Sequence, residues 1–294
     1  MKCLNASAIE AAERFVWLSG RLLDRHRFAH LFRGADRTPA LATLRAYQNP
    51  DGGFGHGLEP DLRGPISQPQ PVELALRLLD EWDAMDDPMV AGACDYLVSI
   101  TRSEGGVPFV LPSARAYPRG PWWEAGDEPP ASLNPTAAIA GLLHRHRVGH
   151  PWLAPATAFC WERLERLERT ETYEARCVLL FLEYTPDRPR AEAVLDRVGG
   201  LIEAQRLVAL DPADISDELP SPLDLVPGPD SLAAGLFSRD VVDAHLDALV
   251  AAQREDGGWP VDWEIWTPAT GLEWRSWVTT EALKTLRAYG RWRS

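Results

Sequence analysis

The residues of this sequence whose types and spacing could do chemistry are acids held beside prolines. Glu59 and Asp61 flank Pro60 and precede Pro65, so the restricted backbone would keep both carboxylates in defined positions. A carboxylic acid in an apolar cavity has its pKa raised by the loss of hydration, and it can then act as a general acid near neutral pH. We therefore expect Asp61 or Glu59 to be a catalytic acid. The alternative is that both acids cap helix ends or pair with Arg63.

Tryptophans in two proline-containing segments are candidates for substrate contact. Trp122 and Trp123 are adjacent and are poorly placed to share one core, while Trp263 and Trp274 belong to an acidic segment. Aromatic faces stabilise cations and stack on sugar rings. We expect these four side chains to contact substrate, and the alternative is that they anchor loops as ordinary hydrophobic residues.

Three further polar residues complete the predicted site. Glu273 is an additional acid candidate, with Arg275 as a possible partner, and His56 lies between two glycines and could be a base or a ligand. A single histidine is more often structural, so that alternative stays open. The cysteines have no paired spacing, which predicts reduced thiols and no metal site; they are Cys3, Cys94, Cys160 and Cys177.

Double-glycine segments recur along the chain at intervals of about fifty residues. They begin at Gln48, Thr101 and Gln253, and Gln205 marks a weaker fourth position. Each follows a helical apolar pattern, where glycine supplies the left-handed conformation that ends a helix. The pattern predicts eleven helices, near 7–27, 37–48, 68–82, 87–101, 132–148, 151–168, 171–185, 188–206, 231–237, 239–254 and 276–290.

Helical hairpins in repeats of this size predict an all-α fold, an α/α toroid similar to an α6/α6 barrel, formed by residues 1–294 as a single domain. An open helical solenoid of the same hairpins is the alternative. Long loops alternate with short links, so we expect the long ones to gather on one face as the mouth of a central cavity. These predicted mouth loops are about 49–67, 102–131, 207–229 and 255–275.

The mouth loops carry most of the net charge. They hold 17 acidic residues and 5 arginines, which accounts for −12 of the −13 of the whole chain. An acidic protein is a poor partner for nucleic acid or for an anionic membrane surface. The sequence also has no apolar run long enough for a membrane span and no signal-peptide pattern, so we expect a cytoplasmic protein. Nothing in the sequence points to a particular oligomeric state.

The repeated segments resemble the glutamine–tryptophan repeats of the terpenoid cyclase and protein prenyltransferase superfamily, over roughly residues 37–290. The stretch Gly52-Gly-Phe-Gly-His-Gly57 is similar to the glycine-rich turns of prenyltransferase β subunits. The resemblance implies a squalene-cyclase-like α/α toroid with an apolar, aromatic-lined cavity, and it implies isoprenoid chemistry.

The chemical motifs of that superfamily are not reproduced. Class II cyclases carry Asp-x-Asp-Asp-Thr-Ala, and the nearest match, Ser132-Leu-Asn134-Pro135-Thr136-Ala137, contains no acid. A second partial match around Asp230 keeps one acid. The cysteine and histidine zinc ligands of prenyltransferases have no counterpart, and the mouth loops lack basic clusters for a diphosphate. The resemblance therefore extends to the fold and not to the standard chemistries.

Three functions are compatible with these features. We expect an enzyme, a lyase or isomerase that binds a small hydrophobic isoprenoid-type substrate and starts cyclisation or isomerisation of a carbocation with Asp61 or Glu59. A carboxylate-based glycoside hydrolase or lyase is the second possibility, and a non-catalytic toroid that binds a ligand or a protein is the third. No cofactor is expected, except Mg²⁺ if the substrate is a diphosphate.

Overall fold

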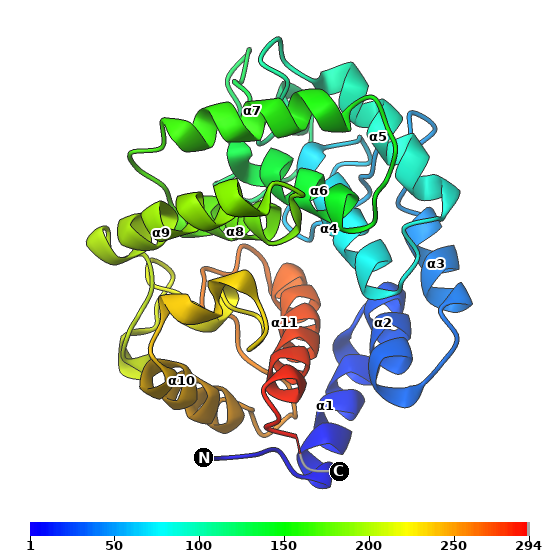
Figure 1. The fold of residues 1–294 in the computed structure, drawn as a ribbon. Coiled ribbons are helices and arrows are strands. Elements are labelled where there is room, and N and C mark those ends of the chain that lie inside the picture. Colours follow the sequence, from blue (N-terminus) through cyan, green and yellow to red (C-terminus); the bar gives the residue numbers. More distant parts are fainter. Residues whose placement is uncertain (293–294) are drawn as a thin grey trace. The chain divides into compact units, whose positions relative to one another are not determined.

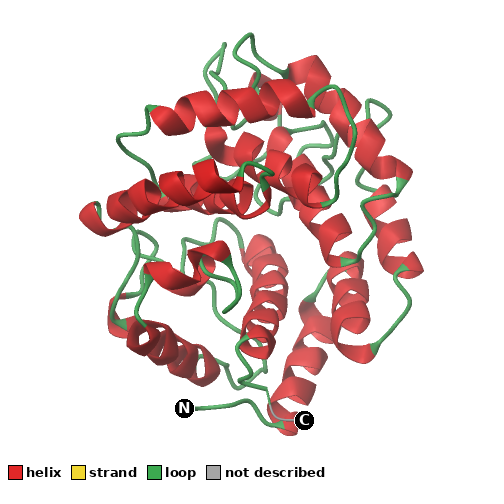
Figure 2. Cartoon of the chain, in the orientation of Figure 1, coloured by secondary structure: helices red, strands yellow, loops and turns green. Residues whose placement is uncertain are grey.

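The computed structural model describes residues 1–292, which form helices and loops without a named β-strand (Figures 1 and 2). The all-α fold class is thus confirmed for these residues. The α-helices are α1 (Ala6–Ser19), α2 (Leu22–Arg33), α3 (Thr38–Arg45), α4 (Pro69–Glu81), α5 (Pro88–Ile100), α6 (Leu133–Arg145), α7 (Leu153–Glu165), α8 (Thr172–Tyr184), α9 (Arg188–Ala204), α10 (Arg239–Ala251) and α11 (Pro268–Ala288).

Two compact units make up the chain. Unit 1 consists of Met1–Ala40 and Ile202–Ser294, and unit 2 consists of Leu41–Leu201. Closure of the helices into a ring, and their assignment to a single domain, stay predictions.

Helix α6 is the centre of unit 2. It packs most extensively against α8 and also contacts α4 and α7 (Figure 1). All residues from Leu133 to Leu143 are buried, as expected for a helix covered on every side. A side chain at Gly141 would lie 2.6 Å from the backbone oxygen of Leu180, so glycine permits the close approach of α6 to α8.

Unit 1 packs α1, α10 and α11 around a shared apolar core that includes Phe15, Trp259 and Leu283. The sequence predicted one helix over 7–27, but the structure breaks it at Gly20, which has an extended conformation. A Cβ atom at Gly20 would lie 2.7 Å from the oxygen of Val16. The chain then resumes as α2, whose first turn is capped by Asp24.

The three double-glycine turns share one backbone geometry. In each, the first glycine has a positive φ of 85° (Gly52), 97° (Gly105) or 93° (Gly257). Each turn also contacts the backbone of another helix too closely for any side chain. A Cβ atom at Gly52 would lie 2.1 Å from the backbone oxygen of Gly92 in α5. At Gly105 it would lie 2.7 Å from the oxygen of Pro155 in α7, and at Gly257 it would lie 2.2 Å from the oxygen of Ala11 in α1.

The glutamine that precedes two of these turns joins each turn to the neighbouring helix. The Gln48 amide donates to the backbone oxygens of Gly52 (2.9 Å) and Met89 (3.1 Å). The Gln253 amide does the same with Gly257 and Ala8, at 2.8 Å each. A glutamine side chain at this position is therefore a structural link within its unit.

We predict that Gly257→Ala destabilises the protein more than Gly34→Ala. Both glycines have a positive φ, but a Cβ at Gly34 would meet nothing within 4 Å. Gly34→Ala should therefore cost about 1 kcal/mol of unfolding free energy, for the backbone conformation alone. Gly257→Ala adds the overlap with Ala11 and should cost at least about 3 kcal/mol. Urea unfolding measures both, and equal losses would contradict the importance of the close approach.

Candidate active site

Two long loops of unit 2 come together beside the first turn of α4. One connects α3 to α4 and the other connects α5 to α6. The Arg63 N–H donates to the oxygen of Pro118 (3.1 Å), and the Gly120 N–H donates to the oxygen of Asp61 (2.9 Å). Leu62 and Arg119 form an antiparallel bridge between these bonds. The backbone of the predicted acid segment is thus fixed by the second loop.

Glu59 and Asp61 are buried in this arrangement, with 6% and 2% of their surfaces exposed. Their segment is a closed loop, because the His56 N–H donates to the oxygen of Gly64 at 2.9 Å. Burial removes a carboxyl group from water and favours its neutral form unless charge or hydrogen bonds compensate. Both acids are therefore shielded from water, and their catalytic role stays a prediction.

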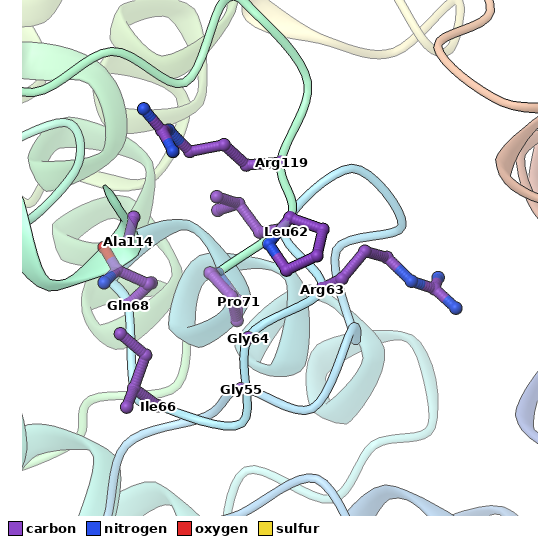
Figure 3. A pocket seen from close by; sticks show the side chains of 10 residues that line it. Gly55, Leu62, Arg63, Gly64, Ile66, Gln68, Pro71, Ala114 and Arg119 are labelled. Carbon is purple, nitrogen blue, oxygen red and sulfur yellow. The ribbon is translucent and has the colours of Figure 1, made fainter. Parts of the chain in front are cut away.

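A small pocket lies between the two loops and the start of α4 (Figure 3), and neither Glu59 nor Asp61 is among its lining residues. Leu62, Gln68, Pro71 and Ala114 are among its lining residues. Its enclosed volume is about 10 Å³, which is about the space of one water molecule. Arg63 and Arg119 extend to opposite sides of it (Figure 3). This pocket can hold a water-sized group beside the acid segment, but it cannot hold an isoprenoid chain.

The two adjacent tryptophans have different environments. Trp123 is 7% exposed, and its ring stacks on Phe109 with centroids 5.0 Å apart, in a cluster that includes Leu62. Trp122 is 38% exposed, and its ring covers Gly120, where a Cβ atom would lie 2.7 Å away. Trp123 therefore anchors the loop, while Trp122 keeps part of its surface open. Substrate contact by either ring stays a prediction.

His56 belongs to a chain of polar side chains that organises the first loop. Its Nε2 atom lies 2.9 Å from Oδ1 of Asn49, whose Nδ2 donates to Oγ of Ser67 (2.9 Å). The Ser67 hydroxyl donates in turn to Asp51 in the double-glycine turn (2.7 Å). These contacts give His56 a structural position, and the structure does not test its role as a base or ligand.

The segment that most resembles the cyclase acid motif is held by hydrogen bonds at the start of α6. Oγ of Ser132 accepts from the N–H of Asn134 (3.2 Å), and Oγ1 of Thr136 bonds to the backbone of Val107. Oδ1 of Asn134 accepts from Nε2 of Gln70 in α4 at 3.0 Å. Gln70 was not identified from the sequence. Its place in the first turn after a long loop was the only available signal.

In unit 1, the predicted loop 255–275 is shorter than expected. Helix α11 begins at Pro268, after the N-cap Thr267, so Glu273, Trp274 and Arg275 lie on the helix. The rings of Trp263 and Trp274 meet edge to face, with centroids 5.3 Å apart. Substrate contact by these two rings, like catalysis by Glu273, stays untested.

Arg275 does not have the partner that the sequence suggested. Its guanidinium makes two 2.8 Å hydrogen bonds to the Asp256 carboxylate and donates to the backbone oxygen of Trp259 at 3.1 Å. The Glu273 carboxylate instead lies 3.9 Å from the guanidinium of Arg21, the N-cap residue of α2. Asp256 belongs to the third double-glycine turn, so Arg275 stabilises that turn from α11.

No three His, Cys, Asp or Glu side chains within residues 1–292 gather as a metal site. In the same part of the chain, no helix has the length and apolar character needed to cross a membrane.

Solved structures provide the comparison with known proteins. No protein-family model and no curated protein matches the sequence. A protein from Actinoplanes is 18% identical, with 97% of this chain and 99% of that chain covered and a TM-score of 0.61.

Two variants of the type II terpene cyclase MstE from Scytonema, each in complex with its substrate geranylgeranyl dihydroxybenzoate, also match. They are 14% and 13% identical, with TM-scores of 0.57 and 0.52, and the alignments cover 96% and 95% of this chain and 97% of each cyclase chain. The protein therefore has a terpene-cyclase-like helical fold over nearly its whole length.

We predict that Arg275→Gln lowers stability in a pH-dependent way. Hydrogen bonding to Arg275 keeps the pKa of Asp256 below its ordinary value of 3.8. A lowered carboxyl pKa stabilises the folded protein above that ordinary value, and the stabilisation is lost as the pH falls through the folded pKa. Because Asp256 is half exposed and screened by solvent, the substitution should cost only about 1 kcal/mol at neutral pH.

The difference in unfolding free energy between the wild type and Arg275→Gln should therefore shrink as the pH falls below 3.8 and through the lower pKa of folded Asp256, where its carboxylate becomes protonated. Asp256→Asn is the matched control, and it should show the same loss at neutral pH. A difference between wild type and variant that does not change with pH would contradict this role of the ion pair.

Proposed function

We propose that this protein is an enzyme that binds a hydrophobic isoprenoid-type substrate and starts its cyclisation or isomerisation by protonation. The observation that carries the proposal is the burial of two acidic side chains, Glu59 and Asp61, in a chain with a terpene-cyclase-like fold. Asp61 is the better candidate for the acid. It is the less exposed of the two, and its backbone is fixed by the N–H of Gly120.

In the proposed reaction, the O–H bond of the Asp61 carboxyl group breaks and the proton goes to one carbon of a substrate double bond. The π electrons form the new C–H bond and leave a cation on the other carbon. A second double bond then attacks that cation to close a ring, or a neighbouring C–H loses its proton in a simple isomerisation. Loss of a proton from carbon restores an alkene, so no oxidant or reductant is consumed.

A cation of this kind needs stabilisation by the protein. Trp122 is a candidate for this role, because it is 38% exposed and its ring covers Gly120, whose N–H bonds to the backbone oxygen of Asp61. An aromatic face near a cation contributes on the order of 1–2 kcal/mol. The acidic loops oppose a free diphosphate, so the proposed substrate is uncharged.

The test uses the purified full chain with geranylgeraniol or squalene in D₂O, with products identified by mass spectrometry. Protonation by an exchangeable acid should place one deuterium on carbon in each product. Asp61→Asn should lower turnover at least about 100-fold, the usual contribution of a general acid. Asp196→Asn, at an exposed position of α9, is the matched control and should keep wild-type turnover.

Glu59→Gln separates the two buried acids, and it should have a smaller effect than Asp61→Asn. Unchanged turnover in Asp61→Asn would refute the assignment of the acid. Products without deuterium would refute acid initiation.

A further inference from the structure

Two amide side chains meet at the start of α4 and α6. Gln70 and Asn134 each lie in the first turn of their helix, directly after one of the two long loops of unit 2. Nε2 of Gln70 donates to Oδ1 of Asn134 at 3.0 Å. A carboxamide has one acceptor oxygen and two N–H donors, so this bond uses only part of the capacity of each group.

The remaining atoms of the pair are available to a ligand. Within residues 1–292, Oε1 of Gln70 and Nδ2 of Asn134 have no hydrogen-bond partner in the protein, and neither is a fully buried atom. The conclusion does not depend on which way the amides are turned. If both were reversed, Asn134 would donate to Gln70, and one donor and one acceptor would again remain.

Asn134 is held rigidly, which suits a binding residue. It is only 8% exposed, and its backbone N–H donates to Ser132. Two residues later, the Thr136 side chain accepts from the Val107 N–H at 3.0 Å. Groups that are fixed before binding lose little further freedom when a ligand arrives.

The surroundings select an uncharged ligand group. The amides carry no charge, and the acid on the next turn of α4, Glu73, is already bonded to Arg77. The neighbouring positions of both helices are apolar and buried, such as Val72 and Ala137. One remaining acceptor and one remaining donor in this pair suit a hydroxyl group, which can donate one hydrogen bond and accept another.

We propose that Gln70 and Asn134 bind a hydroxyl group of the substrate. This inference rests on the proposed function, because it assumes the isoprenoid substrate proposed there and assigns the binding site of its polar end. The pair determines specificity and takes no part in proton transfer. The inference therefore narrows the proposed substrate to an isoprenoid alcohol and excludes an isoprenoid hydrocarbon.

The experiment compares two ligands that differ in one group. Geranylgeraniol and the hydrocarbon in which hydrogen replaces its hydroxyl are titrated into the full chain by calorimetry. The wild type should bind the alcohol about tenfold more tightly, as expected for a hydrogen-bonded group. Asn134→Leu and Gln70→Leu should each remove this preference and leave hydrocarbon affinity within about twofold of wild type, since only the polar contact is lost.

Binding of the hydrocarbon reports that each variant is folded. Gln70→Leu changes a partly exposed residue, so it gives a readout even if Asn134→Leu fails to fold. Equal affinities in the wild type, or a preference that survives in Gln70→Leu, would overturn the hydroxyl site while the proposed function stands. No binding of either ligand by the wild type would overturn both.

Discussion

The structure depends on backbone-to-backbone contact at the double-glycine turns. The turns at Gly52, Gly105 and Gly257 each contact another helix within a distance that excludes a Cβ atom. In unit 2, two of these contacts fix the points where the long loops leave α3 and α5. Each loop therefore begins at a fixed turn and ends at a packed helix. The two loops can pair with each other and bury polar groups although they do not belong to a β-sheet.

The pairing of these loops produces the candidate site. The bonds made by Arg63 and Gly120 lie on either side of Leu62, and Leu62 packs in the cluster anchored by Trp123. Apolar packing therefore stabilises the loop contact, which holds the backbone of the segment where Glu59 and Asp61 are buried. The same loops lead into the first turns of α4 and α6, where an amide pair supplies neutral hydrogen-bonding groups. A buried acid and a neutral polar pair are compatible with an uncharged substrate.

Much of the helical architecture could be predicted from apolar periodicity and the glycine repeat, because both act locally. The break at Gly20 was missed because the apolar pattern continues through it, and the early start of α11 was missed because Trp263, Glu264 and Trp266 obscure the pattern before Pro268. The contacts of Arg275 with Asp256 and of Gln70 with Asn134 join residues distant in sequence. Such pairs follow from the packing of helices, and residue type alone does not reveal them. The acids Glu59 and Asp61 were selected as candidates because prolines beside them marked an ordered loop; both are buried, and their catalytic role stays a prediction.

The most direct test of the central claim is a crystal structure of the full chain with geranylgeraniol. The account predicts that the hydroxyl group lies within hydrogen-bonding distance of both Gln70 and Asn134, and that a double bond of the chain lies next to the Asp61 carboxyl group. An alcohol bound with its hydroxyl away from both amides and no double bond near Asp61 or Glu59 would contradict it.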